Sequence, residues 1–110
     1  MQLPVSPFQV IAWDSVPVTE HAGETGVAKW RTMLIGDVRV RQVEYSAGYL
    51  ADHWCDRGHI LLVLDGELVT ELRDGRTFRL SEGMSYQVSD FGDAAHRSST
   101  ETGASLFIVD

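Results

Sequence analysis

Apolar and polar residues alternate along much of this chain in short runs, and glycine-containing turns separate the runs. Residues 38–41 alternate strictly between valine and arginine, and the run 67–73 places Leu68, Thr70 and Leu72 on one face. A period of two residues is typical of strands with one buried face. No stretch of ten residues carries the 3.6-residue apolar stripe of a helix. The pattern therefore predicts an all-β fold.

Turn signals divide the chain into about nine or ten short strands. The pair Asp74-Gly75 lies between two alternating runs, which is a strong hairpin signal. Such frequent turns are typical of β-sandwiches and β-barrels. The strands are expected at 8–13, 27–35, 38–45, 60–64, 67–73, 76–80, 84–88, 96–100 and 104–109, with a loop at 21–26 and a turn at 65–66.

Length and charge narrow the class of protein. With 110 residues, 44% of them hydrophobic, the chain is expected to form a single domain, 1–110. A formal net charge of -7 argues against nucleic acid or an anionic membrane as a partner. No signal peptide and no membrane-spanning apolar run are visible, and the lone cysteine permits no intrachain disulfide. These features predict a cytoplasmic protein.

The residues with the most distinctive chemistry lie close together, at 52–59. His53 and Cys55 are two positions apart, so they would share one face of an extended strand. Gly58 can turn the chain, and His59 opens the apolar run 60–64. Folded as strand, turn and strand, the segment would aim all three side chains at one point. The spacing makes a metal site possible.

The segment 48–66 resembles the first motif of the cupin superfamily, in which a glycine precedes His-x-His, a glutamate and a final glycine. His53 and Cys55 stand at the two histidine positions, His59 stands at the glutamate, and Gly66 ends the motif. Gly48 lies one residue nearer to His53 than in the usual pattern. The spacing from His53 onward matches, whereas two of the three ligand types are replaced.

The second cupin motif is a weaker match, and it runs from Gly83 to His96. Ser89 replaces the usual proline, Thr100 replaces an asparagine, and the loop before His96 is longer by about two residues. The chain also resembles a group of small cupins described by an Asp/His/Cys/Trp motif, which is here 52–55. Both resemblances imply a double-stranded β-helix, or jelly-roll barrel.

The cupin resemblance implies that motif residues converge inside the barrel. The implied metal ligands are His53, Cys55, His59 and His96. Imidazole and thiolate suit zinc, iron, nickel or copper rather than magnesium or calcium. Four protein ligands would form a closed tetrahedral zinc site, and a displaced ligand would leave a position for substrate. The alternative is a metal-free barrel in which Cys55 is a small core residue.

Other polar residues are candidates for the pocket wall. Tyr49 shares the parity of His53, and Tyr86, Ser98 and Thr100 lie on neighbouring expected strands. The sequence predicts Tyr49, Tyr86 and Ser98 as substrate-binding residues. Arg39 and Arg41 would bind an anionic substrate on an inner face, but they are expected on the outer face. Asp52 is either a partner for a ligating histidine or an exposed turn residue. His21 is expected at the surface.

Two functions remain open from the sequence. One is a metal-dependent enzyme that acts on a small organic molecule, of dioxygenase, isomerase or lyase type. The other is a non-catalytic module that binds a small ligand or a metal. A blue-copper carrier is a distant third option, because no methionine follows the Cys55–His59 pair closely. Small cupins commonly pair, and strand 8–13 could extend a neighbour's sheet, so a homodimer is expected.

Overall fold

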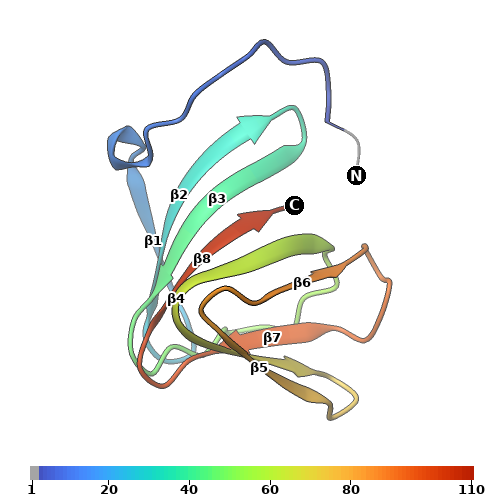
Figure 1. Ribbon diagram of the computed structural model, residues 1–110. Helices are drawn as coiled ribbons and strands as arrows, with labels where there is room; N and C mark the ends of the chain where they lie inside the picture. The colour runs from blue at the N-terminus through green and yellow to red at the C-terminus, as the bar shows by residue number, and fades with distance from the viewer. Residues whose placement is uncertain (1–2) are drawn as a thin grey trace.

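Eight antiparallel strands and one short helix make up residues 3–110, the part of the chain that this computed structural model describes (Figure 1). The helix is a single 3-10 turn, so no helix in the described residues is long enough to cross a membrane. The elements are η1 (Trp13–Ser15), β1 (Val18–Ala22), β2 (Val27–Ile35), β3 (Val38–Tyr45), β4 (His59–Leu72), β5 (Thr77–Ser81), β6 (Ser85–Val88), β7 (His96–Ser99) and β8 (Ala104–Val109).

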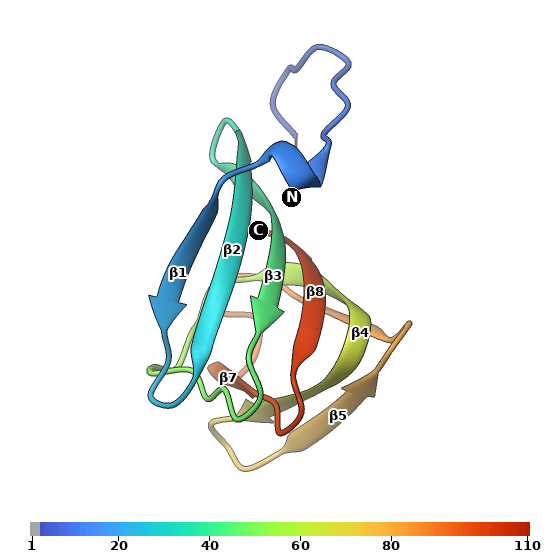
Figure 2. The same ribbon diagram turned by 90° about the vertical axis from the view of Figure 1, so that its left-hand side faces the viewer.

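The strands form two layers that share β4. The larger layer has the order β1-β2-β3-β8-β4 (Figure 2). Strand β6 pairs with the start of β4 on its other edge. The second half of β4 pairs instead with β5 and β7, which form the opposite layer. This architecture is all-β, as the period-two pattern predicts, and it is a jelly roll, as the cupin resemblance implies.

Strand β4 runs without a break through Asp65-Gly66, so the expected turn at 65–66 is wrong. The pairing of β4 with β8 shifts register between Val63 and Asp65, which marks a bulge. Gly66 has φ of +78°, a left-handed conformation that favours glycine. The Asp-Gly pair therefore redirects one long strand from the first layer to the second rather than ending it.

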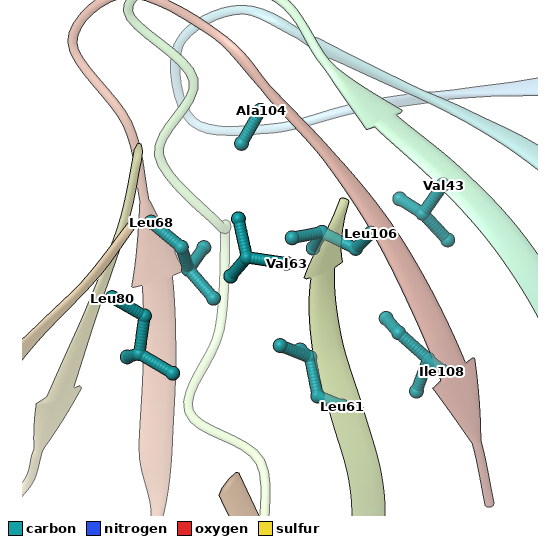
Figure 3. Packing of buried hydrophobic residues seen from close by; sticks show 8 residues of the cluster. All are labelled: Val43, Leu61, Val63, Leu68, Leu80, Ala104, Leu106 and Ile108. Atoms are coloured by element: carbon teal, nitrogen blue, oxygen red, sulfur yellow. The ribbon is translucent and has the colours of Figure 1, made fainter. Parts of the chain in front are cut away.

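Alternating residues of the two layers fill the space between them with aliphatic side chains. Strand β8 shows the pattern most regularly, because Ala104, Leu106 and Ile108 are buried while their neighbours are half-buried. Burial of such side chains contributes about 1.5–3 kcal/mol each. The buried cluster comprises Val43, Leu61, Val63, Leu68, Leu80, Ala104, Leu106 and Ile108 (Figure 3).

The N-terminal region differs from the sequence-based expectation. The strand expected at 8–13 is absent, and the chain there is irregular before η1. Strand β1 was not expected, because its five residues are all exposed and show no apolar periodicity. Val5 and Phe8 are almost fully exposed. Residues 3–12 therefore form an extended arm, which arches over one end of the larger layer (Figure 1).

Candidate functional site

Three polar side chains meet on the inner face near the start of β4. His59 shares the parity of the core residue Leu61, and Leu61 pairs across strands with Tyr86 of β6. His96 begins β7 in the opposite layer, opposite Leu72 at the end of β4. Since β4 contributes to both layers, its two ends bring the two motif histidines into one interior region.

The three side chains are in direct contact. The Tyr86 hydroxyl and His59 Nε2 form a hydrogen bond of 2.6 Å. The rings of His59 and His96 lie 4.7 Å apart between centroids and nearly perpendicular to one another. His96 is only 6% exposed. A half-buried imidazole, a buried imidazole and a half-buried phenol thus form a compact polar group beside the aliphatic core.

Both imidazoles are neutral at physiological pH. Burial, together with the nearby charge of His96, lowers the pKa of His59 to about 4. Burial also lowers the pKa of His96, although Asp56 opposes the effect. Burial raises the pKa of Tyr86, so the phenol keeps its proton. Neutral imidazole nitrogens can accept a hydrogen bond or coordinate a transition metal.

Cys55 lies beside His96 through backbone pairing. The two residues form an isolated antiparallel bridge with reciprocal N–H···O hydrogen bonds of 2.9 Å each. Residues paired in this way project their side chains to the same face. The Cys55 sulfur accepts a weak hydrogen bond of 3.4 Å from the backbone N–H of Arg57. The thiol is therefore a neighbour of the histidine pair.

His53 occupies a different environment. Its side chain is 73% exposed, and its Nδ1 lies 2.6 Å from the Asp52 carboxylate, so Asp52 is indeed a partner of this histidine. The expectation of a strand, turn and strand is wrong here, because residues 51–58 form no strand and only Cys55 makes a bridge. Without a regular strand, the two-residue spacing no longer gives His53 and Cys55 a common face.

The predicted metal set is thus divided in this structure. Residues 3–110 contain no group of three His, Cys, Asp or Glu side chains arranged to hold a metal ion. The rings of His59 and His96 lie together, and Cys55 is paired with His96 through the backbone. The side chain of His53 is exposed to solvent, away from this group. A pair of neutral imidazoles suits zinc, iron, nickel or copper, but it supplies fewer than the three or four protein ligands of most zinc sites. The four-residue set stays a prediction.

A cavity of about 470 Å³ opens onto the histidine group, with Tyr86 and His96 in its wall. Thr70 also lines it, and the buried hydroxyl of Thr70 has no hydrogen-bond partner in the described residues. The volume suits a small organic molecule. The apolar part of the wall comprises Leu72, Phe78, Leu80, Met84, Val88 and Ala94, and the polar part includes the charged residues Arg76, Arg79 and Asp93.

Of the three residues predicted to bind substrate, only Tyr86 lines this cavity. Tyr49 is buried and packs against Tyr45, with ring centroids 4.1 Å apart. Burial raises the pKa of Tyr45 to about 12, and the nearby Ser98 opposes this effect. Tyr49 and Ser98 therefore belong to a second interior polar group, and their role in binding stays a prediction.

Arg41 lies on the inner face of β3, so the expectation of an outer, solvated face is wrong for this residue. It is 6% exposed and stacks on Trp30, with its guanidinium carbon 4.3 Å from the ring centroid. It shares the inward parity of Val43, and its charge is paired with Asp110 at 3.0 Å. The valine–arginine alternation revealed two faces but not which one is buried. His21 is exposed, as expected, and packs against the other side of Trp30.

Comparison with known proteins identifies the fold but no close relative. No profile of a known protein family matches the sequence, and no curated protein matches it. The structure resembles an RmlC-like cupin from Shewanella frigidimarina, with a TM-score of 0.74, 17% identity, and coverage of 99% of this chain and 92% of the other. The remaining similar structures include two enzymes.

Ectoine synthase from P. lautus superposes with a TM-score of 0.74 at 16% identity, over 93% of this chain and 76% of the enzyme. A sugar phosphate isomerase of the cupin superfamily from Silicibacter pomeroyi superposes with a TM-score of 0.68 at 14% identity, over 92% of this chain and 74% of the isomerase. Identities this low establish architecture, not activity. The chain described here has the cupin fold.

Proposed function

We propose that this chain is a metal-dependent cupin enzyme that binds a small organic molecule in the cavity beside His59, Tyr86 and His96. One observation carries the proposal: His96 and Tyr86 line a cavity of about 470 Å³, and the neutral imidazole of His59 contacts both of them, with its ring 4.7 Å from that of His96. A buried polar side chain is costly unless it is hydrogen-bonded or bound to a metal, and a neutral imidazole nitrogen can do either. A transition metal held by His59 and His96 would use both rings.

Further donors for such a metal are close at hand. Cys55 is paired with His96, and Tyr86 already contacts His59. A bound metal would supply Lewis-acid polarisation of a substrate oxygen. The protein's own groups would have separate tasks: the apolar side chains of the wall would contact the carbon skeleton of a substrate, Thr70 offers an unpaired hydroxyl, and the protonated Tyr86 can donate a proton or hydrogen bond. These tasks fit dioxygenase, isomerase or lyase chemistry.

The fold neighbours support an enzymatic role without assigning a reaction. Two of them are named as enzymes, a synthase and an isomerase, so this barrel accommodates catalysis. Their interiors are built on sequences that share only 16% and 14% identity with this chain. The substrate of this protein must therefore be sought from its own cavity.

A non-catalytic binding module is the second candidate, and one observation favours it. His59 Nε2 is already hydrogen-bonded to Tyr86, and residues 3–110 show no three-residue metal group. A metal-free barrel with a satisfied polar core would still bind a small molecule in the same cavity. In that case the histidines would position a ligand through hydrogen bonds.

Elemental analysis separates the two candidates. The protein is purified without added metal, and then equilibrated with zinc, iron(II), nickel or copper and desalted. The enzyme proposal expects about one equivalent of one metal per chain, with the same content in His21→Gln, whose histidine is exposed on β1. A wild-type protein that neither retains nor takes up metal would support the binding module instead.

A further inference from the structure

Three arginines surround one carboxylate at the end of the barrel where His59 lies. Arg39 donates two hydrogen bonds of 2.9 Å to Asp110, one to each oxygen. Arg41 donates one of 3.0 Å, and Arg57 Nε lies 3.6 Å from the same carboxylate. Within residues 3–110, no second acidic side chain forms an ion pair with any of these arginines. Among side chains, three guanidinium groups thus face one carboxylate, in a protein of formal net charge -7.

Arg41 has an unused donor in this cluster. Its side chain is 7% exposed, and its Nε is buried with no hydrogen-bond partner among the described residues. A buried N–H without an acceptor is costly, and the cost is larger for a charged group. The stacking on Trp30 holds the guanidinium in a fixed plane. The cluster thus presents a preorganised donor that lacks an acceptor.

Arg57 gives the cluster an open side. It lies in the irregular segment 51–58, its side chain is 44% exposed, and its distance of 3.6 Å to Asp110 is too long for a hydrogen bond. The Asp110 carboxylate is only 2% exposed, so it cannot be reached from solvent. An incoming anion would meet Arg57 first, because its side chain is the most exposed of the three and its contact with Asp110 is the longest.

The cluster adjoins the histidine group through the sheet register. Ile108 of β8 pairs with Arg41 on one side and with Leu61 on the other, so all three lie in one row across the sheet. One step further along the strands, the pair Ile60–Val109 places Asp110 beside His59. Arg39, Arg41, Asp110 and His59 are therefore on one inward face, at one end of the larger layer.

We propose that Arg41 and Arg57 bind the carboxylate of an acidic small molecule, whose remaining part reaches the group of His59, Tyr86 and His96. The planar fork of a guanidinium matches the two oxygens of a carboxylate, and Arg39 already binds Asp110 in this way. A bound carboxylate would accept a hydrogen bond from Arg41 Nε. This inference rests on the proposed function, because it names the substrate class of that site.

The test uses the whole chain in metal-free form, with succinate as the anionic probe and succinamide as its neutral counterpart. Amide NMR spectra that include arginine Nε–H groups report directly on Arg41. Succinate is expected to shift the Arg41 Nε–H signal, whereas succinamide leaves it in place. In Arg57→Gln the succinate affinity is expected to fall about tenfold or more. Arg73→Gln removes an equally exposed arginine outside the cluster and should bind as the wild type does.

Two results would overturn the inference: equal succinate affinity in wild type and Arg57→Gln, or equal binding of succinate and succinamide. Replacing succinate with inorganic phosphate decides between carboxylate and phosphate chemistry, and preferential binding of phosphate also contradicts the proposal. Because these titrations use metal-free protein, their outcome is independent of the metal analysis. Anion binding without metal uptake would refute the proposed enzyme alone, and metal uptake without anion binding would refute this inference alone.

Discussion

The Tyr86 hydroxyl lies 2.6 Å from His59 Nε2 and connects β6 to β4 inside the barrel. His96 approaches the same imidazole from the opposite layer, with ring centroids 4.7 Å apart. These contacts fix the orientation of a histidine that would otherwise be free to rotate in an aliphatic surrounding. Reactive nitrogens are held in place by the fold before any ligand arrives, which is the arrangement that a preorganised site requires.

Stability should fall in mild acid because His59 must enter the fold uncharged. Burial and the nearby His96 lower the pKa of His59 to about 4, whereas the unfolded chain binds the proton near its ordinary value. Folding stability is therefore fully present above pH 6.5 and decreases as the pH falls toward 4, by up to about 3 kcal/mol.

Urea unfolding at pH 7.5 and pH 4.5 measures this effect, and His59→Gln should reduce the difference between the two values. His96 contributes in the same direction, since its pKa is lowered as well. His53→Gln is the control, because that side chain is 73% exposed. An identical pH dependence in His59→Gln and wild type would show that His59 is not buried in its neutral form.

Replacing Cys55 distinguishes a ligand from a packed thiol. If its sulfur contributes to a metal site beside His96, Cys55→Ala lowers metal content strongly, whereas Cys55→His restores the usual cupin pair of donors and retains metal. If the thiol only packs, alanine leaves metal content unchanged and costs about 1 kcal/mol of stability, and histidine overpacks the site. Metal content and urea unfolding of both variants decide between these outcomes.

Gly66 should be far less tolerant of substitution than Gly75, although both have positive φ. A Cβ at Gly66 would collide with the carbonyl oxygen of Gly103, in addition to the strain at φ +78°. A Cβ at Gly75 would meet nothing within 4 Å. Gly66→Ala is therefore expected to lose about 3 kcal/mol of unfolding free energy and Gly75→Ala about 1 kcal/mol. Equal losses would contradict the account of β4 as one strand that changes layers.

The homodimer remains a prediction, and the N-terminal arm now gives it a location. Val5, Phe8 and Val10 are 108%, 96% and 79% exposed, which is unusual for apolar side chains. Light scattering at micromolar concentration should show a dimer for the wild type and a shift toward monomer for Phe8→Ser. Phe91→Ser is the control, since Phe91 is also 80% exposed but lies in a distant loop. A wild-type protein that is only monomeric would refute the prediction.

Local sequence determined most strands because alternation and turn residues act locally. The Asp74-Gly75 hairpin and the alternating strand β8 were predicted and are confirmed. Asp65-Gly66 has the same local signal as Asp74-Gly75, yet it forms a bulge, because Ser105 and Ala104 of β8 continue to pair across it. Pairing with a strand forty residues away cannot be read from a dipeptide.

The candidate site was predictable in part for a similar reason. His59 and His96 belong to the two cupin-like motifs, and the fold brings them together. The prediction for His53 depended on a regular strand, which does not form. Its two-residue spacing from Cys55 therefore did not show on which side its imidazole lies. To place Arg41 correctly, one must know which face of β3 is buried. The residue that pairs with its charge there, Asp110, lies 69 residues later in the chain. Long-range partners, rather than local pattern, decided each of these positions.

Metal affinity of three histidine variants tests the central claim most directly. Cobalt(II) is titrated into wild type, His59→Gln, His96→Gln and His53→Gln, with visible absorption as the readout and circular dichroism to confirm the β fold. We predict that His59→Gln and His96→Gln bind the metal at least tenfold more weakly, because each loses one imidazole donor of the buried pair. His53→Gln, altered at a side chain that is 73% exposed, should bind as the wild type does. A loss of cobalt binding in His53→Gln equal to that in His96→Gln would contradict the account.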